Sequence, residues 1–357
     1  MTMRYGKTLI ALSSLVAAAG AHAQAPALLH GGSVETRSAG SDLGAAIRSA
    51  AGARTEPVWI AWAVPIAPEP GDACCFSGDL RHRGGRGCRL DGRSLSYNIG
   101  NNDPRVVPSE ELVVYERFEG GAASKVRAFS GDCPVEAGAE RVVWLDDVQA
   151  EQSVAYLARQ ARELPQDDGP GDDALLALAL HGDKSADVEL IALAGPKSPM
   201  DVREDAIFWL GQARGRRGYQ ELARMADSET DAHILGKVAF SLSQSPVDEA
   251  GGKLEKLAFE HRDPEVREEA IFWAGQRDGD DMAAKLKRAA QQDPALEVRK
   301  KAVFALSQLD DGGGTTALLD LLRHGRETEI RKEALFWLGQ SDDPRAIESL
   351  EALLLKK

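Results

Sequence analysis

The sequence has few cysteines, few aromatic residues and, after its first residues, no apolar run long enough to cross a membrane. Four cysteines among 357 residues are too few for a disulfide-dense mini-protein, although they suffice for two bonds. A P-loop and the motifs GxGxxG, HExxH and GxSxG are absent, which disfavours an enzyme. The 43 basic residues are outnumbered by 56 acidic ones, and the formal net charge of −13 excludes a general binder of nucleic acid. We therefore expect a soluble, non-catalytic protein that needs no cofactor.

Residues 1–23 have the three parts of a secretory signal peptide. Arg4 and Lys7 precede the apolar run 8–19, and a site of two small residues follows, with Ala23 as its last residue. The run is too short for a membrane span. The sequence therefore predicts a periplasmic or secreted protein after removal of the signal peptide.

Residues 25–164 predict a compact α+β module. Alternating apolar and polar residues predict strands at 57–65, 112–118, 124–129 and 141–145. The second and third of these strands flank Gly120-Gly121, which is typical of an antiparallel hairpin. Two helices are expected, a short one at 41–51 capped by Ser41 and an amphipathic one around 154–161.

All four cysteines lie in this module, at Cys74, Cys75, Cys88 and Cys133. In an oxidising compartment an even number implies two disulfides. Adjacent cysteines pair only with strain, so we expect Cys74 and Cys75 to bond separately to Cys88 and Cys133, in either of the two arrangements. The alternative is a structural zinc site formed by Cys74, Cys75, His82 and Cys88, but export favours oxidation.

Residues 165–173 consist of turn-forming and acidic residues and predict a linker. From 174 to 357 the chain repeats with a period of 32 residues, in about six units. Two framework positions recur in five units, phenylalanine at Phe208, Phe240, Phe272, Phe304 and Phe336, and glutamine at Gln212, Gln244, Gln276, Gln308 and Gln340. Each unit predicts a helical hairpin that cannot bury its apolar stripe alone, so neighbouring hairpins must stack into a superhelical rod.

The motif Val-Arg-x-x-Ala at 202–206, 266–270 and 298–302 closely resembles the HEAT-like repeat of the phycobilisome-lyase type. The resemblance covers about residues 172–357 and implies an α-solenoid, a HEAT-like α-α superhelix, preceded by the small disulfide-stapled α+β module. The module itself resembles the cysteine-containing segment that precedes such repeats in exported bacterial proteins. A chromophore lyase is disfavoured, because those proteins act on cytoplasmic phycobiliproteins that an exported chain would not meet.

A longer period of 64 residues is visible in the tryptophans Trp209, Trp273 and Trp337. Charges alternate with the repeats at one position, in the series Asp205, Lys237, Glu269, Lys301 and Glu333. These side chains form either a ladder of opposite charges or independent solvated charges, and each exposed pair is worth at most about 1 kcal/mol. The glutamine column is either a ligand row or, as we favour, a set of capping or inter-repeat contacts.

We therefore expect an exported, non-catalytic scaffold that binds a partner protein along the solenoid, in the groove lined by the second helix of each repeat. The net acidic charge favours a basic partner. The leucine-rich last helix, 346–355, is a second surface on which another chain could pack. The alternative is that the N-terminal module binds a ligand or metal and the solenoid is a spacer.

Overall fold

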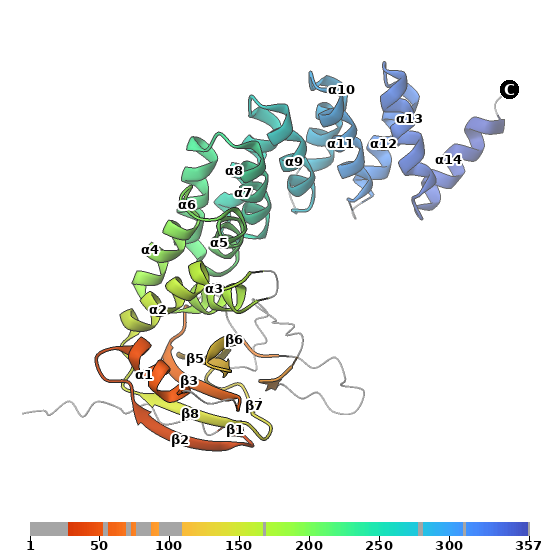
Figure 1. The fold of residues 1–357 in the computed structure, drawn as a ribbon. Helices are drawn as coiled ribbons and strands as arrows, with labels where there is room; N and C mark the ends of the chain where they lie inside the picture. Colours follow the sequence, from red (N-terminus) through yellow and green to blue (C-terminus); the bar gives the residue numbers. More distant parts are fainter. Residues whose placement is uncertain are drawn as a thin grey trace, which may run out of the picture.

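The computed structural model describes residues 28–52, 56–68, 73–75, 87–92, 109–166, 169–277, 281–309 and 312–355. The predicted signal peptide, 1–23, and His82 of the predicted metal alternative lie outside these residues. The described chain forms a sheet-containing module followed by a rod of paired helices (Figure 1). No helix within the described ranges combines the length and the apolar character that crossing a membrane would require.

The N-terminal module is built on a five-stranded mixed sheet. In spatial order its strands are β2 Ser33–Ser38, β8 Arg141–Asp146, β3 Val58–Pro65, β5 Glu111–Glu119 and β6 Ala122–Ser130. β3 is antiparallel to β5 and parallel to β8. The predicted hairpin is confirmed: β5 and β6 pair antiparallel around Gly120 and Gly121, whose φ angles of 60° and 83° are the positive values that a tight hairpin turn requires.

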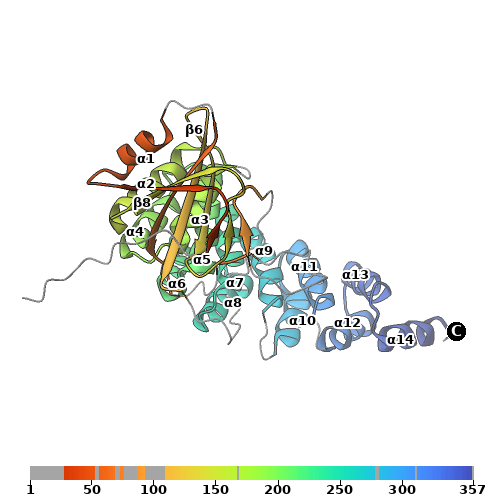
Figure 2. The ribbon, with the colours of Figure 1, turned by 90° about the horizontal axis from the view of Figure 1, so that it is seen from below.

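Both faces of this sheet are covered by other parts of the chain, and β3 is accordingly apolar at nearly every position. Ile60 and Trp62 pack into the core that also contains α1 (Leu43–Ala51) and α2 (Ala150–Glu163), and the two helices cover that face (Figures 1 and 2). Trp59 packs into a second core on the opposite face. This second face carries a small sheet of β1 Leu29–His30, β7 Val135–Glu136 and β4 Cys88–Arg89. Side chains that alternate along one strand thus serve two cores.

Aspartate side chains begin two of the predicted helices. Asp42, and not Ser41 as predicted, is the N-cap of α1, and its carboxylate accepts a hydrogen bond of 2.9 Å from the backbone N–H of Ala45. Asp263 caps α9 in the same way, and Pro264 follows as the first helical residue, where a missing N–H costs nothing.

The sheet and the repeats are joined by direct contacts. Arg127 of β6 donates to Asp173 at the start of α3 over 2.8 Å, and the same carboxylate accepts from the Val126 N–H. At the other end of α3, Ile66 and His181 form an isolated β-bridge. The linker prediction for 165–173 is therefore wrong from Pro170 onward, because these residues form the first turn of a helix that is attached to the sheet at both ends.

The predicted solenoid is confirmed by an uninterrupted series of helix pairs (Figure 1). One layer of the rod consists of α3 Pro170–Leu180, α5 Met200–Ala213, α7 Ala232–Gln244, α9 Pro264–Gly275, α11 Leu296–Ser307 and α13 Thr328–Gly339. The other consists of α4 Lys184–Leu193, α6 Gly215–Ser228, α8 Glu249–Glu260, α10 Met282–Gln292, α12 Gly313–His324 and α14 Pro344–Leu355. Neighbouring helices contact one another more extensively in the first layer than in the second. The first layer is therefore the more closely packed side of the rod.

In three units the arginine of the Val-Arg-x-x-Ala motif links the repeat to the next one. Arg267 of α9 is buried and forms two hydrogen bonds of 2.8 Å with the carboxylate of Asp293, which follows α10. Arg203 binds Glu229 and Arg299 binds Glu327 at the same place in their units. The motif arginine thus binds a carboxylate in the turn before the next repeat, a role that recurs with the repeat.

Candidate functional site

The framework phenylalanines lie on the first-layer helices and form a continuous row of rings with the three tryptophans. Phe208 and Phe240 stack with centroids 5.8 Å apart and an interplanar angle of 12°, and Phe272 and Phe304 stack at 5.5 Å and 6°. We call the full set the ring row: Phe208, Trp209, Phe240, Phe272, Trp273, Phe304, Phe336 and Trp337.

The tryptophans bridge successive pairs of phenylalanines. Trp273 lies 4.5 Å from Phe240 of the preceding helix and 4.8 Å from Phe272 of its own helix. Trp337 makes the matching contacts with Phe304 and Phe336, at 4.7 and 5.0 Å. The 64-residue tryptophan period is the sequence signal for this bridging, although the period alone does not show which rings meet.

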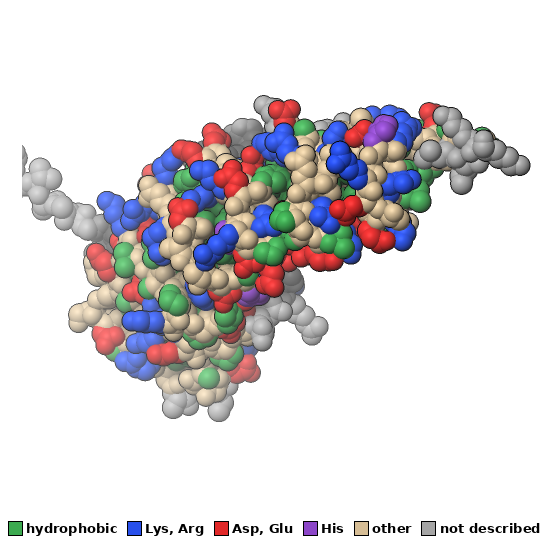
Figure 3. Space-filling model, turned by 90° about the horizontal axis from the view of Figure 1, so that it is seen from above, with side chains coloured by type: hydrophobic (Ala, Val, Ile, Leu, Met, Phe, Trp, Pro, Cys, Tyr) green, Lys and Arg blue, Asp and Glu red, His purple; other side chains and the backbone are tan. Residues whose placement is uncertain are grey.

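The ring row is partly open to solvent along its whole length. All of its rings are half-buried except Phe336, which is 55% exposed. Figure 3 shows acidic side chains gathered beside hydrophobic ones along the lower edge of the rod. Figure 2 is seen from the opposite side, so the same edge is the upper one there, where α9, α11 and α13 lie. Exposed aromatic surface with a charged border is typical of a surface that binds another molecule.

A depression lies on the ring row between α7 and α9. It has a volume of about 640 Å³, and Phe240 and Trp273 form its apolar wall. Its polar lining includes Glu265, Glu268 and Glu269 of α9. This is room for a side chain together with the backbone that carries it.

The predicted charge ladder is built one position earlier than the alternating series suggested. Lys237 binds Glu204, at 2.6 Å, rather than Asp205. In the same way Lys301 lies 3.8 Å from Glu268. Burial and the neighbouring carboxylates Asp172, Glu204 and Asp201 raise the pKa of Asp205 to about 6.

The glutamine column does not line the depression between α7 and α9. Two of its members donate to the serine that precedes them, Gln244 to Ser243 and Gln308 to Ser307. Gln308 and Gln340 line a different depression of about 420 Å³, beside the ends of α11 and α13. The complete column lies where first-layer helices end: Gln212, Gln244, Gln276, Gln308 and Gln340.

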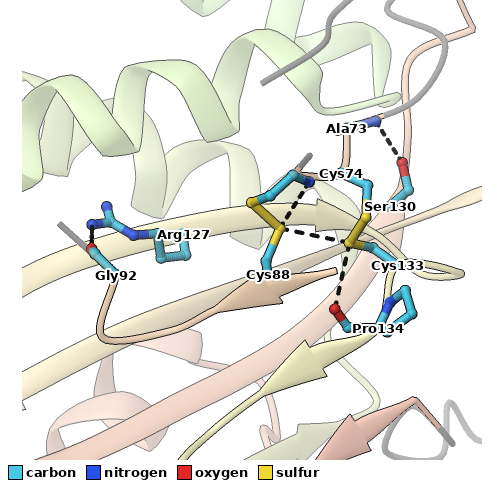
Figure 4. The surroundings of a disulfide bond; sticks show 9 residues. Ala73, Cys74, Cys88, Gly92, Arg127, Ser130, Cys133 and Pro134 are labelled. Carbon is cyan, nitrogen blue, oxygen red and sulfur yellow. Dashed lines mark hydrogen bonds between the residues drawn. A yellow bond between two sulfur atoms is a disulfide. The ribbon is translucent and has the colours of Figure 1, made fainter. Parts of the chain in front are cut away.

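The four cysteines form two disulfides in the second core of the module, Cys74–Cys133 and Cys75–Cys88 (Figure 4). This is one of the two arrangements expected from the sequence. The sulfur atoms of Cys88 and Cys133 are only 3.6 Å apart, so the two bonds lie side by side. The sulfur atoms of Cys74, Cys88 and Cys133 all lie within 4.8 Å of one another, a spacing that would suit a metal only if the bonds were reduced.

The end of the rod exposes a second apolar surface. Leu335 of α13 is 47% exposed, whereas the corresponding residues of the four preceding units, Ile207, Ala239, Ile271 and Val303, are fully buried by the next helix pair. Ile347 of α14 is 52% exposed. Of the segment 346–355, for which the sequence predicted packing against another chain, Ile347 and Leu355 are exposed and Leu350 packs against the core.

Comparison with protein families identifies the repeats. Residues 252–336 match the family model of HEAT repeats, and residues 330–356 match that of the PBS lyase HEAT-like repeat. Among curated proteins, none matches this sequence.

Several solved structures match part of this chain. Human deoxyhypusine hydroxylase in complex with glycerol is 20% identical over 58% of this chain and 80% of that chain, with a TM-score of 0.30. YibA of Escherichia coli is 20% identical over 58% and 79%, with a TM-score of 0.37. The CpcE and CpcF complex of phycocyanin lyase from Nostoc is 20% identical over 57% and 80%, with a TM-score of 0.29. At these scores the likeness carries no argument about activity.

Proposed function

We propose that this chain, a HEAT-repeat protein, is an exported scaffold that holds a basic segment of a partner protein along the ring row and catalyses no reaction. The observation that carries the proposal is the ring row itself: eight aromatic side chains in mutual contact, partly exposed, on one layer of the rod. Aromatic side chains dominate the binding energy of protein interfaces because they bury large apolar areas with little loss of conformational freedom.

This proposal moves the binding surface from the second helices, where the sequence placed it, to the first. The second layer also has a depression, of about 550 Å³ between α8 and α10, but Phe259 is the only aromatic residue that lines it. A continuous aromatic strip is found on the first layer among the described residues. The first layer therefore offers more contact area to an extended partner.

Charge supports a basic partner. The chain has a formal net charge of −13, and the ring row borders the carboxylates of Glu265 and Glu269. A negative surface speeds the encounter with a basic segment and repels acidic ones. Export is supported by the signal-peptide pattern of residues 1–23, and the absence of hydrolytic and phosphate-binding motifs in the sequence supports a binding role.

The test is site-specific photo-crosslinking in the native cells. Benzoylphenylalanine replaces Phe208 or Phe336 in the ring row and, as a matched control, Phe259 on α8, each in a separate variant. We expect one protein to crosslink from both ring-row positions and not from Phe259. Equal crosslinking from all three positions, or from none of them, would contradict the proposal. Recovery of the protein from a periplasmic fraction, with a mass that lacks residues 1–23, tests export.

The cysteine cluster supports a second candidate, in which the module binds a metal. Three sulfur atoms lie within 4.8 Å of one another, and the cluster is buried. Intact mass under non-reducing conditions separates the two candidates. Loss of two hydrogens per bond without bound zinc supports the scaffold, whereas free thiols with retained zinc support metal binding.

A further inference from the structure

The depression between α7 and α9 combines an aromatic wall with carboxylates. The rings of Phe240 and Trp273 lie 4.5 Å apart at an angle of 45°, so they do not stack face to face. Both rings are half-buried and line the depression. A ring face that is open to a cavity attracts a cation through the negative charge density above the ring.

The two basic side chains that line this depression are already paired with the carboxylate of Glu204 on α5. Lys237 Nζ lies 2.6 Å from one oxygen of Glu204, and His233 Nε2 lies 2.6 Å from the other oxygen. Lys237 and His233 therefore leave the glutamates of α9 unneutralised.

The glutamates of α9 supply the negative charge. Glu268 has Lys301 at 3.8 Å, which is a weak contact. Glu265 and Glu269 have no ion-pair partner within 4.0 Å among the residues that the structure describes.

We propose that this depression binds one arginine side chain of the partner's basic segment, an inference that rests on the function proposed above. The guanidinium stacks on the rings of Phe240 and Trp273 and donates hydrogen bonds to Glu265 and Glu269. Arginine fits better than lysine because its planar group stacks on rings and donates in a fork, whereas an ammonium is a more strongly hydrated point charge.

At the equivalent position two repeats further on, the carboxylates already have partners. The rings of Phe304 and Trp337 are 4.7 Å apart, as in the first pair. The surrounding carboxylates are all engaged: Glu297 with Lys300 at 3.1 Å, Glu329 with Lys332 at 2.9 Å, and Glu333 with the indole N–H of Trp337 at 2.9 Å. The partner therefore lies in one direction, with its arginine over α7 and α9 and an uncharged apolar part over α11 and α13.

The experiment uses the full mature chain and two peptides of equal charge, hexaarginine amide and hexalysine amide, in titration calorimetry at physiological salt. Two triple variants are compared. One carries E265Q, E268Q and E269Q, and its matched control carries E297Q, E329Q and E333Q. Each variant removes three negative charges from the same layer, so non-specific attraction falls equally in both. Circular dichroism establishes that both variants are folded.

We expect wild type to bind hexaarginine at least about threefold more tightly than hexalysine. The first triple variant should weaken hexaarginine binding at least about tenfold, whereas the control should weaken it less than about threefold. W273A should behave like the first variant and W337A like the control. Equal losses in the two triple variants, or equal binding of the two peptides by wild type, would overturn the arginine site.

Failure of this site and failure of the scaffold are distinguishable. Photo-crosslinking from Phe336 does not depend on the α9 glutamates. If the peptides fail to discriminate while one partner still crosslinks from Phe336, the scaffold stands and the arginine site is wrong. If both experiments fail, the ring row is not a binding surface.

Discussion

Glu116 gives a pH dependence of stability that can be calculated from the structure. It lies in β5, is fully buried, and its carboxylate accepts hydrogen bonds of 2.6 Å from Tyr156 and 2.7 Å from Gln160, both of α2. Burial raises the pKa of Glu116 from its ordinary value of 4.5 to about 7, although the two hydrogen bonds oppose the shift. The folded state therefore binds this proton more tightly than the unfolded state does.

The sign of the effect follows from linkage. Below pH 4.5 the carboxyl is protonated in both states and costs nothing; as the pH rises from 4.5 to 7 the unfolded chain releases the proton first, and stability falls. Above pH 7 the loss is complete, at about 3 kcal/mol. Glu116→Gln removes the titration, so its stability relative to wild type should rise by about 2 to 3 kcal/mol between pH 5 and pH 8.

The assay is urea unfolding of wild type and Glu116→Gln at both pH values, followed by near-ultraviolet circular dichroism, which reports on the tryptophans, including the buried Trp59, Trp62 and Trp144 of the module. Glu163→Gln is the control, because Glu163 lies on α2, the helix that contacts Glu116, but at its exposed end. If wild type and Glu116→Gln lose stability in parallel between pH 5 and pH 8, Glu116 is ionised in the folded state and the reasoning is refuted.

Three further substitutions test the packing, each by urea unfolding. Gly218→Ala places a Cβ atom against the backbone oxygen of Leu210 in α5 and should lower the free energy of unfolding by at least about 2 kcal/mol. Gly252→Ala meets nothing within 4 Å and should be neutral or stabilising. Equal effects of the two substitutions would contradict the close approach at Gly218. Arg267→Ala should lower the free energy of unfolding by about 3 kcal/mol because it leaves the Asp293 carboxylate unpaired. Its control, Arg331→Ala in the last unit, removes an exposed side chain and should lower it by less than about 1 kcal/mol. Cys133→Ser opens a crosslink of 59 residues and should cost about 4 kcal/mol, a loss that should vanish when both proteins are compared in reductant.

Much of the candidate site could be recognised in the sequence, because its aromatic residues recur with the repeat period. The phenylalanine column and the alternating tryptophans are recurring framework positions in the sequence, and residues separated by one repeat occupy equivalent places on successive helices. Their mutual contact was not predictable, since it depends on the rotation between successive units. The sequence placed the partner on the second helices, whereas we propose the first layer, because a repeat pattern does not tell which side of the rod is more closely packed.

The sequence by itself determined the solenoid, the hairpin at Gly120-Gly121 and the presence of two disulfides, because period, turn chemistry and cysteine number act locally or through identical neighbours. Only the tertiary structure decided which cysteines pair, that Glu116 is buried beneath α2, and that Lys237 binds Glu204 while Glu269 keeps its charge free of an ion pair within the described chain. Each of these depends on distances between segments far apart in the chain, and such distances are set by packing, which no single stretch of residues encodes.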